Sequence, residues 1–416
     1  MSPLREIPIV INDRALVVVS SAVSAVISAV CLVVSARLLG PLEFGVLATL
    51  LAAVSTATFL TRSILLAAAR ASAVAREARQ EQALRGVCGR ALVAVTVWGA
   101  LTLAVSYWLA HPIDRLLHTG GTTPILLSTL LVAVLIYSQV VAGLLLGLER
   151  TGTYALMMTA DPIVRTALTI PLIGLMGAGG AIGAFVISAA TACFLGTARI
   201  GCPGWKTPAE PALMSLLTTA VASAILISIT AVAQYMDVLS IRAYAHPLEA
   251  GLYATANTLA GVLFVVGMPV CLAAYPRFVR AVRAGEARAS HLLRDASTIA
   301  SLGIIAFVAS FVLAEPVVVL GLGAEFAGAA SLTPALTAKT ALNLGLLLIG
   351  SYGLALHRSR LVLVASTPAA IPAIVLPILQ PSVGEVALLS CAATSVGIAM
   401  CLVATSMHHS TEKRVG

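Results

Sequence analysis

Seven charged residues lie within long apolar stretches of the sequence or at their ends, where charged side chains are rare. They are Arg37, Arg62, Asp161, Arg165, Asp237, Arg242 and Lys339. A charge at the centre of a bilayer costs about 2.5–3.5 kcal/mol even on the lenient insertion scale, so each such residue is a candidate for function. Arg62, Arg165 and Lys339 are cations well inside an apolar stretch, whereas Asp161 is the one acid in such a position. This balance favours an anionic ligand.

Lys339 is the strongest candidate among them. It lies about eight residues into its apolar run, or roughly 12 Å at 1.5 Å per residue. No acidic residue lies within a helical turn of it. Lys339 would therefore contact an anion in a cavity, pair with an acid from another helix, or extend its ammonium to the membrane surface.

Asp161 and Arg165 are four residues apart, the spacing at which opposite charges meet on one face of a helix. Protonation of Asp161 would release Arg165 for a ligand, so the pair is a candidate coupling device. The alternative is that the pair only holds the geometry of the bundle. Pro162, inside the same run, predicts a kink or break of this helix.

Motifs for other kinds of chemistry are absent from the sequence. It contains no GxxxxGK[ST] loop for nucleotide phosphates, no HExxH and no spaced cluster of Cys and His. The glycine-rich stretch 174–183 joins two apolar runs rather than a strand and a helix, so a dinucleotide site is not expected. We therefore expect no metal, no cofactor and no enzymatic activity.

The composition of the chain requires a membrane. Of its 416 residues, 59% are hydrophobic and 10% are charged, with a mean hydropathy of +1.02. Soluble domains contain about 45–50% apolar and 25% charged residues, and a single soluble core stops growing at roughly 250–300 residues. The excess of apolar side chains must face lipid. In a membrane protein the positions of the basic residues set the topology, and this explains the net charge of +8. We therefore expect no nucleic-acid partner.

Apolar runs of about 20 residues, the length that crosses a bilayer, predict twelve spanning helices. Their approximate ranges are 15–36, 44–69, 91–110, 124–147, 155–176, 180–198, 214–236, 250–274, 297–314, 331–355, 361–379 and 384–406. Strands survive in hydrocarbon only as closed barrels. The predicted fold is therefore an all-α polytopic membrane protein.

The positions of Lys and Arg orient the spans, because cytoplasmic connections carry an excess of these residues. With the N-terminus inside, 19 of the 25 basic residues fall in cytoplasmic segments, three in outer segments and three within spans. Two loops with five arginines each, at 70–90 and 277–294, would contact anionic headgroups. Both termini are predicted to be cytoplasmic.

An internal repeat divides the chain. Residues 41–49 (PLEFGVLAT) match residues 247–255 (PLEAGLYAT) at six of nine positions, with an offset of 206. The repeat predicts two six-helix bundles, residues 1–205 and 206–416. Because six crossings is an even number, the bundles share one orientation and are related by an axis along the membrane normal. A central cavity between them would be the substrate path.

Four segments carry a resemblance to a known family: ARLLGPLEFGVLATL at 36–50, QYMDVLSIRAYAHPLEAGLYATANTLAGVLF at 234–264, YPRF at 275–278 and GAEFAGAASLTPAL at 323–336. In their order and spacing, the chain resembles the polysaccharide and O-antigen flippases of the multidrug/oligosaccharidyl-lipid/polysaccharide exporter superfamily. The resemblance covers nearly the whole chain. It implies alternating access, by which a polyprenyl-diphosphate-linked oligosaccharide moves from the cytoplasmic to the outer leaflet for cell-surface polysaccharide biosynthesis.

The resemblance also implies where the protein lies and what it meets. The expected location is the bacterial plasma membrane. The expected partners are the lipid-linked oligosaccharide, membrane lipids, and a glycan polymerase or glycosyltransferases of the same pathway.

Under this resemblance the cations form the expected substrate site. Lys339 and Arg165 would meet the diphosphate, and Arg62, two turns from the cytoplasmic end of its helix, would line the inner mouth or extend to the membrane surface. Arg37 and Arg242 occupy equivalent places in the repeat. They would receive the diphosphate at an outer vestibule.

Alternative interpretations remain open for several of the polar residues. Arg37 and Arg242 would instead pair with Glu43 and Glu249, or contact headgroups. Asp237, a second candidate coupling residue, is expected to end the seventh helix as a hydrogen-bonded cap or as a partner for Arg242. Lone amides at Asn257 and Asn343, like the small-residue stripe Ser21, Ser24, Ser28 and Ser35, more often serve contacts between helices than ligands.

Other functions compete with the flippase. A multidrug cation antiporter of the same superfamily would need buried carboxylates and aromatic walls, but aromatic residues make up only 5% of the chain. A membrane-embedded glycan polymerase or acyltransferase would need a larger outer loop or a paired His/Asp site. A non-transporting membrane scaffold is the remaining alternative.

Overall fold

The computed structural model describes residues 13–59, 64–65, 68–69, 72, 81–200, 212–283, 289–356 and 358–412. In these ranges the chain is helical and contains no strand. The long helices are α1 (Asp13–Phe59), α3 (Glu81–Leu117), α4 (Thr122–Gly147), α5 (Thr151–Ile200), α6 (Ala212–Tyr244), α7 (Pro247–Arg283), α8 (Ala289–Pro316), α9 (Ala327–Ala355) and α12 (Val383–Glu412). The prediction of an all-α fold is confirmed.

Shorter pieces complete the bundle. A π-helical turn, η1 (Val317–Leu322), and a 3₁₀ turn, η2 (Ala324–Phe326), lead from α8 into α9. The apolar run before α12 is divided into α10 (Ser359–Ser366), a 3₁₀ turn, η3 (Thr367–Ala370), and α11 (Pro372–Leu379). Counting such a divided run as one, the described part of the chain has ten helical segments long and apolar enough to cross a membrane. The protein is therefore a multi-pass membrane protein.

Two of these segments are much longer than one crossing. α1 has 47 residues and α5 has 50, lengths of about 70–75 Å at 1.5 Å per residue, whereas the hydrocarbon core is about 30 Å thick. Each contains one glycine outside the helical region: Gly40 with φ 67° and ψ 174°, and Gly177 with φ 55° and ψ −135°. Glycine adopts positive φ without the steric cost of a Cβ, so the chain turns at these points.

The expected break at Pro162 is wrong. The helix continues through Pro162, and the non-helical residue of α5 is Gly177. A proline inside a helix loses one N–H bond and its ring crowds the carbonyl four residues earlier, but its fixed φ is compatible with a helix, and the backbone stays helical at Pro162. Gly177 instead has the backbone freedom to leave the helix. The glycine-rich stretch is therefore the turn between two apolar runs, as its place in the sequence predicted.

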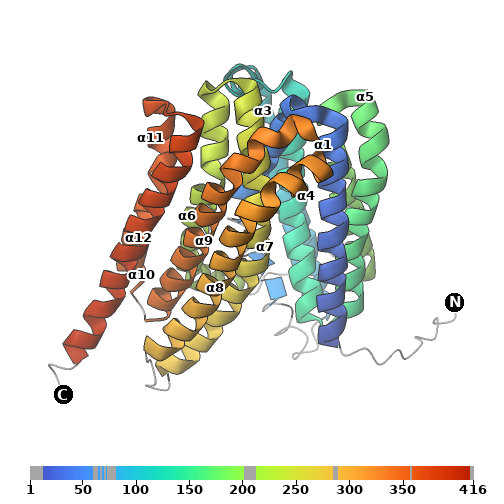
Figure 1. Ribbon diagram of the computed structural model, residues 1–416. Helices are drawn as coiled ribbons and strands as arrows, with labels where there is room; N and C mark the ends of the chain where they lie inside the picture. The colour runs from blue at the N-terminus through green and yellow to red at the C-terminus, as the bar shows by residue number, and fades with distance from the viewer. Residues whose placement is uncertain are drawn as a thin grey trace.

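The bundle has two distinguishable ends. α1 begins and α12 ends at the lower end in Figure 1, the terminal end, while the turns within α1 and α5 and the connection from α8 to α9 lie at the upper end, the turn end. At the turn end one buried cluster, the shared core, joins both halves of the chain: its members range from Ala36 to Ala189 and from Val238 to Ala387. The halves are thus packed together there.

Toward the terminal end the buried residues form two separate clusters. One, from Ala68 to Ile200, belongs to the first half of the chain. The other, from Leu226 to Ala404, belongs to the second half, and Phe59 is its one described buried member from the first half. The described halves therefore share a core at one end and keep separate cores at the other.

Candidate functional site

The ammonium of Lys339 is held by three oxygen atoms of two other helices. Its Nζ lies 2.7 Å from Oδ2 of Asp237, 2.9 Å from the carbonyl oxygen of Gln234 and 2.9 Å from Oδ1 of Asn257. Lys339 itself is completely buried. Because an ammonium has three N–H donors, all of them are used within the protein in this state.

A wider hydrogen-bond network surrounds this ion pair. The Tyr253 hydroxyl donates to the same Oδ2 of Asp237. Gln234 donates from Nε2 to Oγ1 of Thr340 at 3.0 Å and accepts at Oε1 from Nδ2 of Asn343 at 2.9 Å. Thr394 of α12 donates to Oδ1 of Asn343 at 3.3 Å. The network therefore connects α6, α7, α9 and α12 inside the second half of the chain.

The position of Asp237 differs from the expectation. α6 continues to Tyr244, so Asp237 lies about two turns inside the helix rather than at its end. Its partner is Lys339, not Arg242. The sequence placed the helix end too early because Asp237 lowers the local hydropathy, yet a carboxylate paired with an ammonium is accommodated within a helix. The amides Asn257 and Asn343 serve helix–helix hydrogen bonds, as expected.

Arg165 forms a second polar cluster in the first half of the chain. Its NH1 lies 3.7 Å from Oδ2 of Asp161, its NH2 donates to Oγ of Ser28 at 2.6 Å, and its guanidinium carbon lies 4.5 Å from the centre of the Phe185 ring. Ser188 donates to Oδ1 of Asp161 at 2.8 Å. The predicted i,i+4 pair is therefore formed and is supported by α1 and by the second part of α5.

Arg165 is less enclosed than Lys339. Its side chain is 12% exposed and that of Asp161 is 30% exposed. Within the described part of the chain, the buried Nε of Arg165 has no hydrogen-bond partner. An unpaired donor on a buried guanidinium costs desolvation energy, so the cluster around Arg165 is less completely satisfied than that around Lys339.

Arg37 and Arg242 lie at the turn end and bind backbone carbonyls of the opposite half. Arg242 of α6 donates from Nε to the Leu117 carbonyl at 2.8 Å and from NH2 to the His118 carbonyl at 2.8 Å, at the end of α3. It also donates from NH1 to the Pro247 carbonyl at 3.1 Å. Cations at helix C-termini interact favourably with unpaired carbonyls. Arg242 is buried there.

Arg37 makes the corresponding contact in the reverse direction. From α1 it donates through Nε to the Gly321 carbonyl at 2.6 Å and through NH2 to the Leu320 carbonyl, both in η1 after α8. Each half thus places one arginine on the last carbonyls of a helix of the other half. We call these two contacts the arginine clasps.

Arg37 and Arg242 do not form the alternative ion pairs with the nearby glutamates. Glu43 instead accepts at Oε2 from the backbone N–H of Ala178 at 3.2 Å, directly after the turn at Gly177. A carboxylate at a helix N-terminus is stabilised by the unpaired N–H groups there. Arg62 lies outside the residues that the structure describes.

The structure brings several partners to these clusters that the sequence did not predict. Tyr253 belongs to the repeated segment, where the first copy has Leu47; that difference between the copies was the available signal. Phe185 and Ser188 lie beyond the turn at Gly177, so no spacing connects them to Arg165. Of the stripe on α1, Ser24 donates to the Met158 carbonyl at 2.7 Å, which confirms its role in packing against α5.

Comparison with known proteins agrees with this architecture. The structure is similar to the inward-facing conformation of a multidrug resistance MATE family transporter of the MOP superfamily, with a TM-score of 0.77, 13% identity and coverage of 95% of this chain and 96% of the other. It is similar to the lipid II flippase MurJ in an inward closed conformation, with a TM-score of 0.71, 14% identity and coverage of 94% and 87%. It is also similar to the eukaryotic MATE transporter AtDTX14, with a TM-score of 0.66, 14% identity and coverage of 95% and 93%.

The chain therefore has the fold that these solved membrane proteins share. The profile of the polysaccharide biosynthesis protein family matches residues 11–282, well over half of the sequence. The chain belongs to that family. None of the curated proteins matches it.

Proposed function

We propose that this protein is a flippase that moves a polyprenyl-diphosphate-linked oligosaccharide from the cytoplasmic to the outer leaflet by alternating access. The observation that carries the proposal is the arrangement of the buried cores. Within the described residues, the halves share one core at the turn end and, apart from Phe59, keep separate cores at the terminal end. This is the arrangement of a transporter that is closed on one side and open on the other. Packed interfaces of this kind switch between two states rather than deform continuously.

In this proposal the chain crosses the membrane twelve times. The turns at Gly40 and Gly177 divide α1 and α5 into two crossings each, which gives two parallel six-helix bundles, residues 1–205 and 206–416. The excess of Lys and Arg in the connections at the terminal end supports a cytoplasmic location for that end and for both termini. The state described is then open to the cytoplasm, in the plasma membrane of a bacterium.

Arg165 is the residue we assign to the diphosphate. Its guanidinium is partly exposed, and arginine binds phosphate oxygens through its fork of N–H groups. Lys339 has no such capacity, because its three donors are bound within the second half. Lys339 and Asp237 are therefore assigned to the structure of that half, and Asp161 is the candidate for coupling.

The arginine clasps have a separate role in this mechanism. Arg37 and Arg242 hold the ends of helices from opposite halves together at the turn end. Opening toward the outside requires these contacts to break. They are assigned to the closure of the outer gate rather than to the first binding of substrate.

Depletion of the protein in its host tests the proposal. Polyprenyl-diphosphate saccharides of the plasma membrane would be quantified separately by leaflet accessibility. Accumulation of one species on the cytoplasmic face is the expected result, and it would also identify the glycan and the glycosyltransferases that supply it. Absence of such accumulation would contradict the flippase.

A multidrug cation antiporter is the second candidate, because MATE family transporters are among the proteins similar in fold. Its substrate is a cation, which would be repelled by Arg165 and attracted by Asp161. New sensitivity of the depleted host to cationic drugs, without saccharide accumulation, would favour this candidate. A scaffold role would leave both measurements unchanged.

A further inference from the structure

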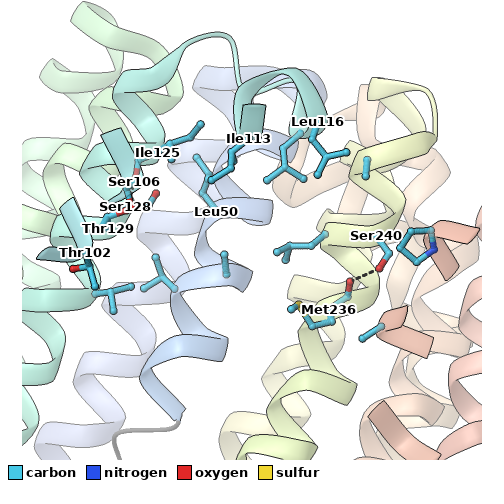
Figure 2. Close-up of a pocket in the computed structure, with 18 of the residues that line it drawn as sticks. Leu50, Thr102, Ser106, Ile113, Leu116, Ile125, Ser128, Thr129, Met236 and Ser240 are labelled. Carbon is cyan, nitrogen blue, oxygen red and sulfur yellow. Dashed lines mark hydrogen bonds between the residues drawn. The ribbon is translucent and has the colours of Figure 1, made fainter. Parts of the chain in front are cut away.

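A cavity of about 610 Å³ lies between the two halves of the chain. Its walls come from α1, α3 and α4 on one side and from α6 and α11 on the other, as Figure 2 shows. The volume falls within the range of about 300–1,000 Å³ that is usual for small-molecule sites. Because both halves contribute walls, movement of the halves would change its shape.

The walls are apolar, and their hydroxyls are engaged within the protein. Thr102 donates to the Trp98 carbonyl at 2.9 Å, Ser128 to the Pro124 carbonyl at 2.8 Å and Ser240 to the Met236 carbonyl at 2.9 Å. No charged side chain is among the described residues that line the cavity. A sugar or phosphate placed here would leave polar groups without partners at high cost, so the walls suit hydrocarbon.

The cavity is not enclosed by protein on every side, and one of its wall residues is held at the turn end. Trp98 and Leu116, both in its wall, are 43% and 56% exposed. Leu117 also lines it, and the carbonyl of Leu117 accepts the hydrogen bond from Arg242. The arginine clasp of α6 therefore holds a wall residue of the cavity at the turn end.

We propose that this cavity binds the isoprenoid chain of the transported lipid. The inference rests on the proposed function, because a carrier whose headgroup passes between the halves must keep its chain in apolar surroundings. A chain held between α3 and α11 is in contact with both halves at once. It would therefore be bound or released as the halves move, which bulk lipid on the outer surface would not be.

Photolabelling of the whole protein in vesicles tests this site. The probe is a polyprenyl phosphate with a diazirine in its isoprenoid chain, compared with a phosphatidylcholine that carries the same diazirine in an acyl chain. We expect the polyprenyl probe to label α3, α6 and α11 at the cavity, and excess unlabelled polyprenyl phosphate to prevent the labelling. Equal labelling by phosphatidylcholine, unaffected by that competitor, would assign the cavity to bilayer lipid and overturn the inference.

Two neighbouring residues of α11 provide a matched pair of variants. Ala373 lines the cavity, whereas Ile374 is 72% exposed and is not in its wall. Ala373→Phe should reduce labelling at the cavity about tenfold, as expected when a bound chain loses roughly two buried methylene contacts. Ile374→Phe should leave it unchanged. Loss in both variants, or in neither, would overturn the assignment.

Labelling and transport are measured separately, so failure of the site and failure of the proposed function remain distinguishable. Normal flipping by Ala373→Phe despite lost labelling would remove the cavity from the transport path and leave the flippase intact. Saturable labelling of a protein that moves no lipid-linked saccharide would keep the chain-binding site and reject the flippase.

Discussion

Gly45 and Gly251 pack backbone to backbone where α1 meets α7. A methyl group on Gly45 would lie 2.5 Å from Cα of Gly251, and one on Gly251 would lie 2.3 Å from the carbonyl oxygen of Pro41. The two glycines are the fifth residues of the two copies of the repeated segment. The copies therefore contact each other at the turn end, and only glycine allows this approach.

Gly45→Ala should force the halves apart at the turn end. Overpacking of this kind costs about 1–3 kcal/mol, and here the cost falls on the closed outer gate. A reporter cysteine at Ala48, which is buried in the shared core, should react faster with a thiol reagent that does not cross the membrane. Transport should fall.

Gly261→Ala is the matched control, because a methyl group at Gly261 meets no atom within 4 Å. It lies on α7, the same helix as Gly251. Equal effects of Gly45→Ala and Gly261→Ala on cysteine reactivity would show that the glycine contact does not close the gate.

The arginine clasps should contribute unequally to the same gate. Arg242 is buried and Arg37 is exposed, and hydrogen bonds to charged groups contribute about 1.5–3 kcal/mol when water does not compete. Arg242→Gln should therefore increase the reactivity of the Ala48→Cys reporter more than Arg37→Gln does. Arg115→Gln, at an exposed residue in the last turn of α3, is the control. An order in which Arg37→Gln has the larger effect would contradict the model of a buried main clasp.

Lys339→Met should lower the stability of the folded protein and not only its transport activity. Removal of one partner from a buried ion pair costs about 3–5 kcal/mol, because the other charge is left alone. Adding Asp237→Asn removes that charge and should restore part of the stability. Thermal unfolding of the two single variants and the double variant measures the coupling. Additive losses would show that the two side chains do not depend on each other.

Membrane insertion could be predicted from the sequence because it depends on the length of apolar runs. That length predicted helical segments that the structure contains within its described residues, including the two apolar runs of α5 that meet within residues 174–183. Part of the predicted span 44–69 lies outside the described residues. The break at Gly177 rather than Pro162 was not predictable from proline content alone. The break depends on a positive φ at Gly177, which the positions of the prolines do not indicate.

The pairing of side chains from distant helices could not be predicted from the sequence. Asp237 lies 102 positions from Lys339, and no local spacing encodes that contact. The repeat did predict that Arg37 and Arg242 are equivalent. It could not predict what they bind, because the acceptors are backbone carbonyls of Gly321 and Leu117, which any residue type provides.

Arg165→Ala should abolish or strongly reduce transport while the protein remains folded in the membrane. Its side chain is partly exposed and its pair with Asp161 spans 3.7 Å, so the stability it contributes is small compared with that of the Lys339 pair. Loss of its charge-assisted bonds to a diphosphate would weaken binding about 10–100-fold, from roughly 1.5–3 kcal/mol. Arg165→Lys should keep part of the activity, because it retains charge but loses the fork of donors.

Arg199→Ala is the control on the same helix, since Arg199 is exposed in the last turn of α5. Binding of a polyprenyl diphosphate to purified protein, together with the amount of protein in the membrane, separates the two roles of Arg165. Normal binding by Arg165→Ala would exclude Arg165 from the headgroup site.

Asp161→Asn tests whether Asp161 couples transport to protons. The variant should remove the pH dependence of transport if protonation of Asp161 releases Arg165. An unchanged pH profile would leave the pair with a structural role alone.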